Sequence, residues 1–348
     1  MAARRPTLSM GQVLGGRYRI EAAIGEGGWG SVYRALCREG GYVAVKLLHT
    51  RLAERSVSRK RFEREAALLA RLEHPNVVRL LDAGHADDGA PYLVFELLYG
   101  ESLRDCMRRE GAVAPERAGG IALEVLAGLD AAHGLGIVHR DVKPPNVFLC
   151  RDAAGAAVRA RLLDFGIAKA IGSEESHHTK LTETGQMLGS PAYMAPEQVR
   201  GGEVGPRADL YALGLVLAEL VGGERIVRGE SGVDIILSHV ADAPHVLPEA
   251  VRRSPLGPVV ERAIRKAPEE RYGSAREMAA AIGAALAPRP HAQPAEPRPV
   301  AVAPAAVSAP SAAFAPPVPL APLAPVAPMG LGAPVAAGGP GARAARSS

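Results

Sequence analysis

The chain has 348 residues, a formal net charge of +4 and an isoelectric point near 9.0. The excess positive charge lies mainly after residue 286, so residues 1–286 carry only about +1 and no basic face for nucleic acid is expected. The three cysteines, Cys37, Cys106 and Cys150, are far apart and lack metal-ligand spacing, which excludes a disulfide framework and indicates small core residues in a reduced compartment.

The N-terminal residues are basic but no apolar run follows them. Arg4 and Arg5 lead into small and polar residues, so a secretory signal is not expected and the sequence favours a cytoplasmic location. We expect residues 1–15 to be a flexible N-terminus ahead of a folded domain over 16–286.

A glycine-rich segment opens this domain. Gly25, Gly27, Gly30 and Val32 form the pattern G-x-G-x-x-G-x-V, in which glycine lets backbone N–H groups approach phosphate oxygens. A dinucleotide-binding fold is disfavoured, because a second strand-like stretch at 42–46 follows the glycines where that fold requires a helix. The sequence therefore predicts a phosphate-covering β-hairpin.

Lys46 ends the apolar strand that contains Ala44. A surface lysine at a strand edge is the alternative, but the helix expected over 57–72 favours a buried role. Helical spacing places Glu65 on the apolar face of that helix. A carboxylate there is costly unless it pairs with a cation, so we expect a Glu65–Lys46 ion pair that holds the lysine against nucleotide phosphates.

Residues 91–100 have the pattern of a buried strand that runs into a glycine-punctuated connection between two lobes. Main-chain groups near Glu96 and Leu98 are placed to pair with adenine. The expectation rests on position alone, because main-chain contacts leave little trace in a sequence.

The segment from His139 to Asn146 spaces the groups that phosphoryl transfer to a hydroxyl requires. The Asp141 carboxylate can orient the hydroxyl and accept its proton, Lys143 can neutralise charge on the transferred group, and Asn146 offers an oxygen to Mg²⁺. Asp164 opens the sequence Asp-Phe-Gly after an apolar strand and supplies a second metal ligand. A solvated loop and a turn-forming aspartate are the weaker alternatives.

Residues 189–197 read Gly-Ser-Pro-Ala-Tyr-Met-Ala-Pro-Glu and close the segment that begins at Asp164. With these motifs in order, the chain from Tyr18 to Leu286 closely resembles the eukaryotic-like (Hanks-type) serine/threonine protein kinases of bacteria. The resemblance implies an α+β, two-lobed protein-kinase-like fold. It has a small β-rich N-lobe with one key helix over about 16–97, a larger mostly helical C-lobe over about 98–286, and a disordered tail over 287–348.

The resemblance also implies roles for single residues. ATP binding falls to Gly25, Gly27, Gly30, Val32, Ala44, Lys46, Glu96 and Leu98. Catalysis falls to Asp141 and Lys143, and metal binding to Asn146 and Asp164. Structural or regulatory roles fall to Glu65, His139, Arg140, Phe165, Gly166, Ser190, Glu197, Asp209 and Arg271. The implied cofactors are ATP and Mg²⁺, with Mn²⁺ as an alternative metal.

Some of these implied roles have a local alternative. In the family Glu197 pairs with a late arginine, which Arg271 matches; the alternative is two solvated charges. Asp209 is either a helix N-cap or an acceptor for backbone N–H groups of the catalytic loop. In this family Lys143 favours Ser/Thr over Tyr specificity.

Regulation by phosphorylation is a further implication. Arg140 precedes the catalytic aspartate, and in the family an arginine there usually awaits a phosphate in the activation segment. The candidates are Thr182 and Thr184, then Thr179, with ordinary loop threonines as the alternative. A phosphate adds about −1.5 to −2 charge and would order the segment against Arg140.

Residues 287–348 hold 15 of the chain's 29 prolines. The stretch 299–342 is uncharged, but a membrane span is disfavoured because proline lacks the N–H that a spanning helix must satisfy. Proline at every third position from 316 to 328 predicts a polyproline II spacer. A partner for this proline-rich tail is one expectation, and a linker without a partner is the favoured alternative.

The leading functional hypothesis is a serine/threonine protein kinase that transfers the γ-phosphoryl group of ATP to protein hydroxyls and is activated by (auto)phosphorylation. One alternative is a catalytically weak kinase-fold scaffold, which would normally have lost Lys46, Asp141 or Asp164. The other is a small-molecule phosphotransferase, against which the protein-substrate platform at 189–197 argues. Expected partners are protein substrates and a second kinase domain, but neither nucleic acid nor membrane.

Overall fold

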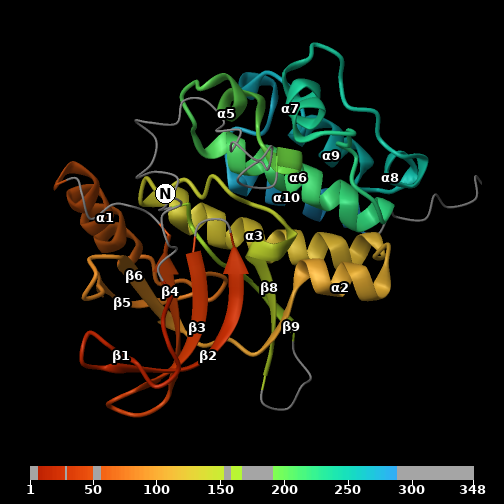
Figure 1. The fold of residues 1–348 in the computed structure, drawn as a ribbon. Coiled ribbons are helices and arrows are strands. Elements are labelled where there is room, and N and C mark those ends of the chain that lie inside the picture. The colour runs from red at the N-terminus through yellow and green to blue at the C-terminus, as the bar shows by residue number, and fades with distance from the viewer. Residues whose placement is uncertain (1–6, 28–29, 50–55, 153–157, 167–190, 288–348) are drawn as a thin grey trace, which may run out of the picture. The chain divides into compact units, whose positions relative to one another are not determined.

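The computed structural model describes residues 7–27, 30–49, 56–152, 158–166 and 191–287 (Figure 1). These belong to the first of two units of the chain, Met1–Arg289, whereas the second, Pro290–Ser348, lies outside the described residues. The predicted disordered tail over 287–348 therefore stays a prediction. No helix within the described ranges is long and apolar enough to cross a membrane.

The N-lobe is built on one antiparallel sheet with the strand order β1-β2-β3-β4-β6-β5. The strands are β1 (Val13–Leu14), β2 (Tyr18–Gly27), β3 (Gly30–Cys37), β4 (Tyr42–Leu48), β5 (Leu80–His85) and β6 (Pro91–Glu96). Alternate β4 residues, Val43, Val45 and Leu47, are buried in a small core with Ile20 and Val94. The predicted hairpin of β2 and β3, followed by a third strand, is confirmed.

The folded region begins before the predicted limit at residue 16. Leu14 in β1 is 2% exposed, and Gly11 donates its backbone N–H to the carbonyl of Ile20 at 2.8 Å. The expected flexible segment therefore does not include residues 11–14. A two-residue strand carries no periodic pattern, which is why sequence analysis could not detect it.

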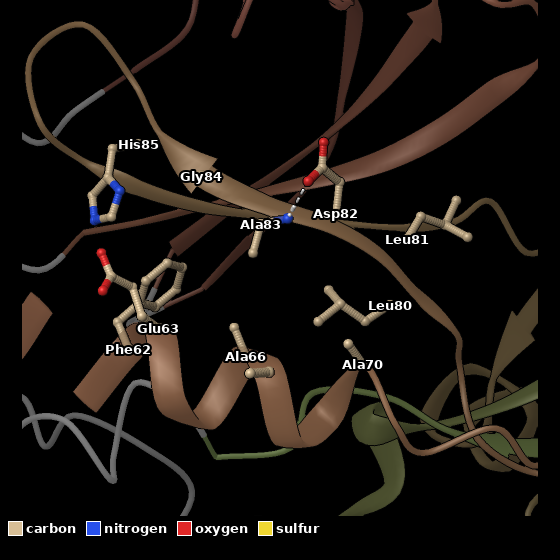
Figure 2. A pocket seen from close by; sticks show the side chains of 11 residues that line it. Phe62, Glu63, Ala66, Ala70, Leu80, Leu81, Asp82, Ala83, Gly84 and His85 are labelled. Atoms are coloured by element: carbon tan, nitrogen blue, oxygen red, sulfur yellow. Dashed lines mark hydrogen bonds between the residues drawn. The ribbon is translucent and has the colours of Figure 1, made fainter. Parts of the chain in front are cut away.

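Helix α1 (Ser56–Leu69) packs against the sheet beside β5. Phe62, Ala66 and Leu69 form its buried face. Figure 2 shows Phe62 and Ala66 of this face turned toward β5, with Leu80 and His85 on the strand side. The hollow that these four residues help to line has a volume of about 370 Å³. The edge of the Phe62 ring meets His85 with a centroid distance of 5.4 Å. Because alanines line much of the helix side, few large side chains join α1 to the strand.

The C-lobe is organised around helix α6 (Pro206–Gly222), in which almost every side chain from 208 to 221 is buried. Proline at its first position and Gly223, with φ of 76°, define its ends. The other helices are α2 (Leu103–Glu110), α3 (Pro115–Gly134), α5 (Pro196–Arg200), α7 (Gly232–Val240), α8 (Glu249–Arg253), α9 (Gly257–Ala263) and α10 (Ala275–Leu286).

A small sheet of order β7-β8-β9 lies where the chain enters this lobe, with β7 (Gly100–Ser102), β8 (Val147–Arg151) and β9 (Val158–Leu162). Its outer strand also contacts the segment before β5, because Val77 bridges to Leu162. The predicted two-lobed α+β fold is confirmed in the described residues.

Two helix-interior glycines allow a test of the core around α6. A Cβ atom at Gly214 would lie 2.7 Å from Ala263 Cβ and 2.9 Å from Ile264 Cγ2, whereas a Cβ atom at Gly120 in α3 meets nothing within 4 Å. We expect Gly214→Ala to lower the free energy of unfolding by about 1–3 kcal/mol through overpacking. Gly120→Ala should raise it by about 0.5–1 kcal/mol. Thermal unfolding followed by circular dichroism measures both, and equal effects of the two substitutions would contradict the close contact of α6 with α9.

Candidate active site

A cleft of about 930 Å³ lies between the two lobes. It is lined by all the predicted ATP-binding residues, namely Gly25, Gly27, Gly30, Val32, Ala44, Lys46, Glu96 and Leu98. It is also lined by the predicted catalytic and metal-binding residues Asp141, Lys143, Asn146 and Asp164. Residues separated by more than a hundred positions in the chain therefore meet at one cleft.

The glycines of β2 and β3 are required for two different reasons. A Cβ atom at Gly30 would collide with the carbonyl oxygen of Leu47 on β4, so close strand packing demands glycine there. At Gly25 and Gly27 a Cβ atom would meet nothing nearer than 3.7 and 3.8 Å. Packing does not explain these two glycines, but an open backbone above the cleft does.

The loop 139–146 brings the predicted catalytic side chains into contact. Lys143 Nζ lies 2.7 Å from Asp141 Oδ2. The Asn146 amide donates to both the main-chain oxygen and Oδ2 of Asp141 at 2.9 Å. Asp141 and Lys143 are only 14% and 15% exposed, so these contacts fix the carboxylate at the edge of the cleft.

The Asp209 carboxylate accepts hydrogen bonds from the backbone of this loop. Its helix begins three residues earlier, at Pro206, so Asp209 is not the N-cap that sequence analysis left as an alternative. Its Oδ2 accepts the backbone N–H of His139 and its Oδ1 that of Arg140, both at 2.8 Å. Arg140 has φ of 63°, a left-handed conformation that is rare outside glycine. The Gln198 amide, which sequence analysis missed, donates to the Arg140 carbonyl at 3.0 Å.

Lys46 pairs with a different carboxylate from the one predicted. Its Nζ lies 2.7 Å from Asp164 Oδ1, and no ion pair joins Lys46 to Glu65 among the described residues. The expected Glu65–Lys46 pair is therefore absent from this structure. The buried face of α1 is formed by Phe62, Ala66 and Leu69, which leaves Glu65 half-buried at its margin. Helical spacing alone could not fix this rotation of the helix.

The donor atoms at the cleft fit a divalent cation. Because the Asn146 amide nitrogen faces Asp141, its Oδ1 is the atom that can turn toward a cation. The Asp164 side chain is 36% exposed, and the Asp164 backbone has a φ angle of 52°. Amide and carboxylate oxygens suit Mg²⁺, whose remaining ligands are usually water and phosphate. No cluster of three or more His, Cys, Asp or Glu side chains forms another metal site in the ranges that the structure describes.

The rings of His139 and Phe165 are in contact, beside the metal-binding residue Asp164, with their planes tilted by 38°. Their ring centroids are 4.5 Å apart, and His139 Nε2 is 2.8 Å from the carbonyl oxygen of Leu163. Burial lowers the pKa of His139, so the neutral ring donates its Nε2 proton to that carbonyl. Gly166 donates its N–H to the His139 carbonyl at 3.0 Å. These contacts join the Asp-Phe-Gly segment to the catalytic loop.

Glu197 and Arg271 form a buried ion pair, which excludes the alternative of two solvated charges. The guanidinium binds both carboxylate oxygens at 2.7 and 2.8 Å and is fully buried. It also donates to three carbonyl oxygens, those of Arg265, Lys266 and Arg207. The pair therefore ties α5 to the segment between α9 and α10.

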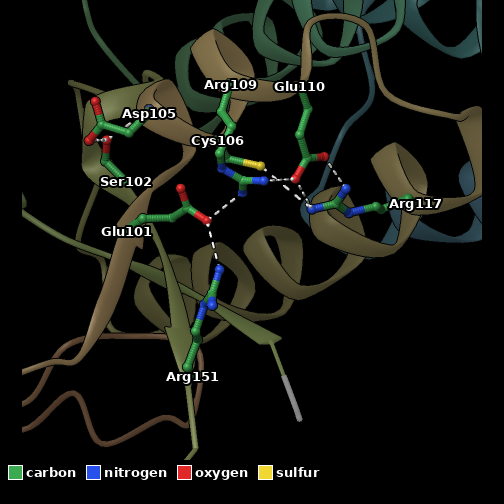
Figure 3. A network of polar contacts seen from close by, with 8 residues as sticks. All are labelled: Glu101, Ser102, Asp105, Cys106, Arg109, Glu110, Arg117 and Arg151. Atoms are coloured by element: carbon green, nitrogen blue, oxygen red, sulfur yellow. Dashed lines mark hydrogen bonds and ion pairs between the residues drawn. The ribbon is translucent and has the colours of Figure 1, made fainter. Parts of the chain in front are cut away.

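Ion pairs that sequence analysis did not predict lie around both ends of α2. Figure 3 shows the Glu101 carboxylate between Arg109 and Arg151, with Glu110 bound by Arg117 nearby. Glu101 Oε1 lies 2.7 Å from Arg109 Nη2 and 3.2 Å from Arg151 Nη2. Glu101 also lines the cleft. Each pair involves a largely exposed arginine and adds little stability alone, but two arginines neutralise the acidic group at the cleft margin. Sequence spacing offers no signal for pairs between separate elements.

Four predicted residues have no structural account. Ser190 and the phosphorylation candidates Thr179, Thr182 and Thr184 lie outside the described residues. Their predicted roles stay predictions.

The comparisons with known proteins agree with this geometry. The family model of the protein kinase domain matches residues 18–280. The serine/threonine-protein kinase pkn3 of Myxococcus xanthus is 38% identical over 285 residues, which are 79% of this chain and 51% of that protein. The serine/threonine-protein kinase PknH of Mycobacterium tuberculosis is 39% identical over 275 residues, 78% of this chain and 42% of that protein.

A solved structure gives the same result. The crystal structure of the Mycobacterium tuberculosis PknI kinase domain matches with a TM-score of 0.61 and 29% identity, over 80% of this chain and all of that chain. The chain therefore belongs to the protein kinase family, and its relatives include bacterial serine/threonine kinases of the Hanks type. It spans about half, or less, of the length of the curated relatives it matches.

A cluster of buried polar groups behind the Glu197–Arg271 pair should make stability depend on pH. The Tyr211 hydroxyl lies 2.8 Å from both His239 Nδ1 and His245 Nε2. Burial, with the nearby Lys266 ammonium, lowers the pKa of His239 to about 3 and that of His245 to about 4. Both rings are therefore neutral in the folded protein near neutral pH.

We expect the free energy of unfolding to fall as the pH drops below about 6.5, because the unfolded chain takes up protons there and the folded chain does not. The loss should reach up to about 1.4 kcal/mol per pH unit for each of the two histidines and should flatten near their folded pKa values. Urea unfolding from about pH 7 to about pH 4.5 measures this slope. His245→Gln should reduce it by up to half, and an unchanged slope in that variant would contradict the assignment.

Proposed function

We propose that the chain is an ATP-dependent serine/threonine protein kinase, with Mg²⁺ as its metal and Mn²⁺ as an alternative. The observation that carries this proposal is the contact of Asp141 with both Lys143 and Asn146 at one side of the cleft, with Lys46 and Asp164 paired beside it. These are the groups that phosphoryl transfer to a hydroxyl requires, and the family membership supports the same reaction.

Each residue has a separable task in the proposed reaction. Asp141 orients the attacking hydroxyl and accepts its proton, while Lys143, 2.7 Å from Asp141, is close enough to neutralise charge on the transferred group. Lys46 leaves Asp164 to bind nucleotide phosphates, and main-chain groups near Glu96 and Leu98 receive the adenine. When bound, the metal neutralises charge on the β- and γ-phosphates, and Asn146 and Asp164 would hold it.

Serine/threonine specificity is favoured by Lys143 and by the curated relatives, which are named serine/threonine-protein kinases. We also propose activation by phosphorylation of the activation segment, a kinase-domain homodimer and a partner of the proline-rich tail. These three proposals rest on the sequence alone. Cytoplasmic location also stays a prediction. A scaffold without activity and a small-molecule phosphotransferase are the outcomes against which the test is designed.

The test follows phosphate incorporation directly. The purified chain is dephosphorylated and then incubated with ATP and Mg²⁺, and intact mass and peptide mapping are recorded, with Asp141→Asn as the control for a contaminating kinase. We expect stepwise gains of one phosphate in the wild type only, at Thr182 or Thr184. Intact nucleotide binding without any gain would favour a scaffold or a kinase that another protein must activate. Turnover of a small alcohol but of no protein would favour the phosphotransferase.

A pair of variants separates binding from chemistry. Lys46→Met should weaken nucleotide binding, because it removes the cation that faces the phosphates. Asp141→Asn should leave ATP affinity nearly unchanged and lower turnover by a factor of at least about 10². Isothermal titration with ATP analogues and initial rates provide the two readouts, and equal losses of ATP affinity in both variants would refute the division of roles.

A further inference from the structure

An ion pair joins the two lobes behind the segment that connects them. Glu96 is the last residue of β6, and Arg161 lies on β9 in the small sheet of the C-lobe. Arg161 Nη1 is 2.5 Å from Glu96 Oε1. The same carboxylate oxygen accepts the backbone N–H of Arg79 at 2.9 Å. One oxygen of Glu96 therefore takes a hydrogen bond from each lobe.

The strand that carries Arg161 is itself firmly placed against the N-lobe. Leu162 donates its N–H to the Asn76 carbonyl at 2.8 Å and accepts from Val78 at 3.0 Å. The Asn76 side chain donates to the Ala160 carbonyl at 2.9 Å. Residues 160 and 162 are thus fixed on both sides of Arg161, so its side chain projects from a rigid base.

The environment of the pair favours a defined geometry. The side chains of Arg161 and Glu96 are 23% and 33% exposed, so the charges are only partly screened by water. Arg161 Nε is buried and has no hydrogen-bond partner among the described residues. The hydrogen bond to Glu96 is the one that the guanidinium makes in the part of the chain that the structure describes, so losing Glu96 would leave a partly buried charge unpaired.

The position of the pair points to a role in nucleotide binding. Glu96 and the next residues, Leu97 and Leu98, line the cleft. Arg161 lies opposite Phe148 in the strand register, and Phe148 also lines the cleft. A contact that restrains the Glu96 side chain therefore also restrains the backbone at residues 96–98, where we propose that adenine binds.

We propose that Arg161 is a positioning residue, and that its ion pair with Glu96 clamps the connection between the lobes in the conformation that binds the nucleotide base. The proposal rests on the proposed kinase function for its kinetic readout. Arg161 itself does not line the cleft, so it acts through Glu96. The side chains of Arg161 and Glu96 are distinct from the catalytic and metal-binding side chains, so the ion pair is a separate contribution to nucleotide binding.

The experiment compares Arg161→Gln with Arg159→Gln in the full chain. Arg159 lies two residues earlier on β9 and is exposed, so it is a matched control of the same chemistry on the same strand. We expect Arg161→Gln to raise the KM for ATP about fivefold, the effect of losing a partly buried ion pair, with kcat within about twofold of the wild type. Arg161→Lys, which keeps the charge, should recover part of the affinity, and Arg159→Gln should change nothing.

A second readout does not depend on activity. Hydrogen exchange of the nucleotide-free protein should be faster over residues 96–100 in Arg161→Gln and unchanged in Arg159→Gln. Glu96→Gln should give the same increase, and the double variant Glu96→Gln/Arg161→Gln should add little to either single change.

The outcomes are distinguishable. An unchanged KM and unchanged exchange in Arg161→Gln would overturn the clamp while leaving the kinase function intact. A higher kcat with an unchanged KM would also overturn it, since the pair would then restrain lobe movement and not position the base. A wild type that binds no ATP would refute the proposed function, and the exchange comparison would still decide whether the ion pair orders residues 96–100.

Discussion

The buried carboxylate of Asp209 is the contact on which the active site depends. It is 1% exposed and accepts hydrogen bonds from the backbone of His139 and Arg140, with His133 Nε2 also 2.8 Å away. The left-handed conformation of Arg140 costs about 1–2 kcal/mol. Two hydrogen bonds to a charged acceptor contribute about 1.5–3 kcal/mol each and outweigh that cost. Helix α6 therefore imposes the loop conformation that places Asp141, and the loop sequence alone would not adopt it.

A second buried charge supports the same lobe. Arg271 makes its bonds to Glu197 and to three main-chain carbonyls while 1% exposed, and its guanidinium lies 4.7 Å from the centroid of the Tyr211 ring. Removing one partner of such a pair leaves an uncompensated charge and costs about 3–5 kcal/mol. The exposed pairs around Glu101 carry no such penalty. Both kinds of ion pair hold elements together, but only the buried pair makes the position of α5 sensitive to a single substitution.

The sequence predicted the two lobes and named twelve ATP-binding, catalytic and metal-binding residues that line the cleft, because these depend on local motifs that follow one another in a fixed order along the chain. It did not predict contacts that depend on the rotation of one element against another. The sequence did not reveal that Lys46 contacts Asp164 instead of Glu65. The reason is that the helical period defines the buried face of a helix only to within about one residue. Strand β1 was too short to detect. The Arg161–Glu96 contact joins residues 65 positions apart and leaves no spacing that a pattern could reveal.

The three glycines of one motif have different consequences for mutational tolerance. At Gly30 the neighbouring strand fills the space of any side chain, so a substitution acts on folding and lowers the amount of protein. At Gly25 and Gly27 a side chain can be accommodated, so the fold survives and only the surface above the cleft changes. The motif therefore meets two separate requirements, close strand packing at Gly30 and an open backbone over the cleft at Gly25 and Gly27. A screen that measures only the amount of folded protein would detect substitutions at Gly30 and would miss those at the other two glycines.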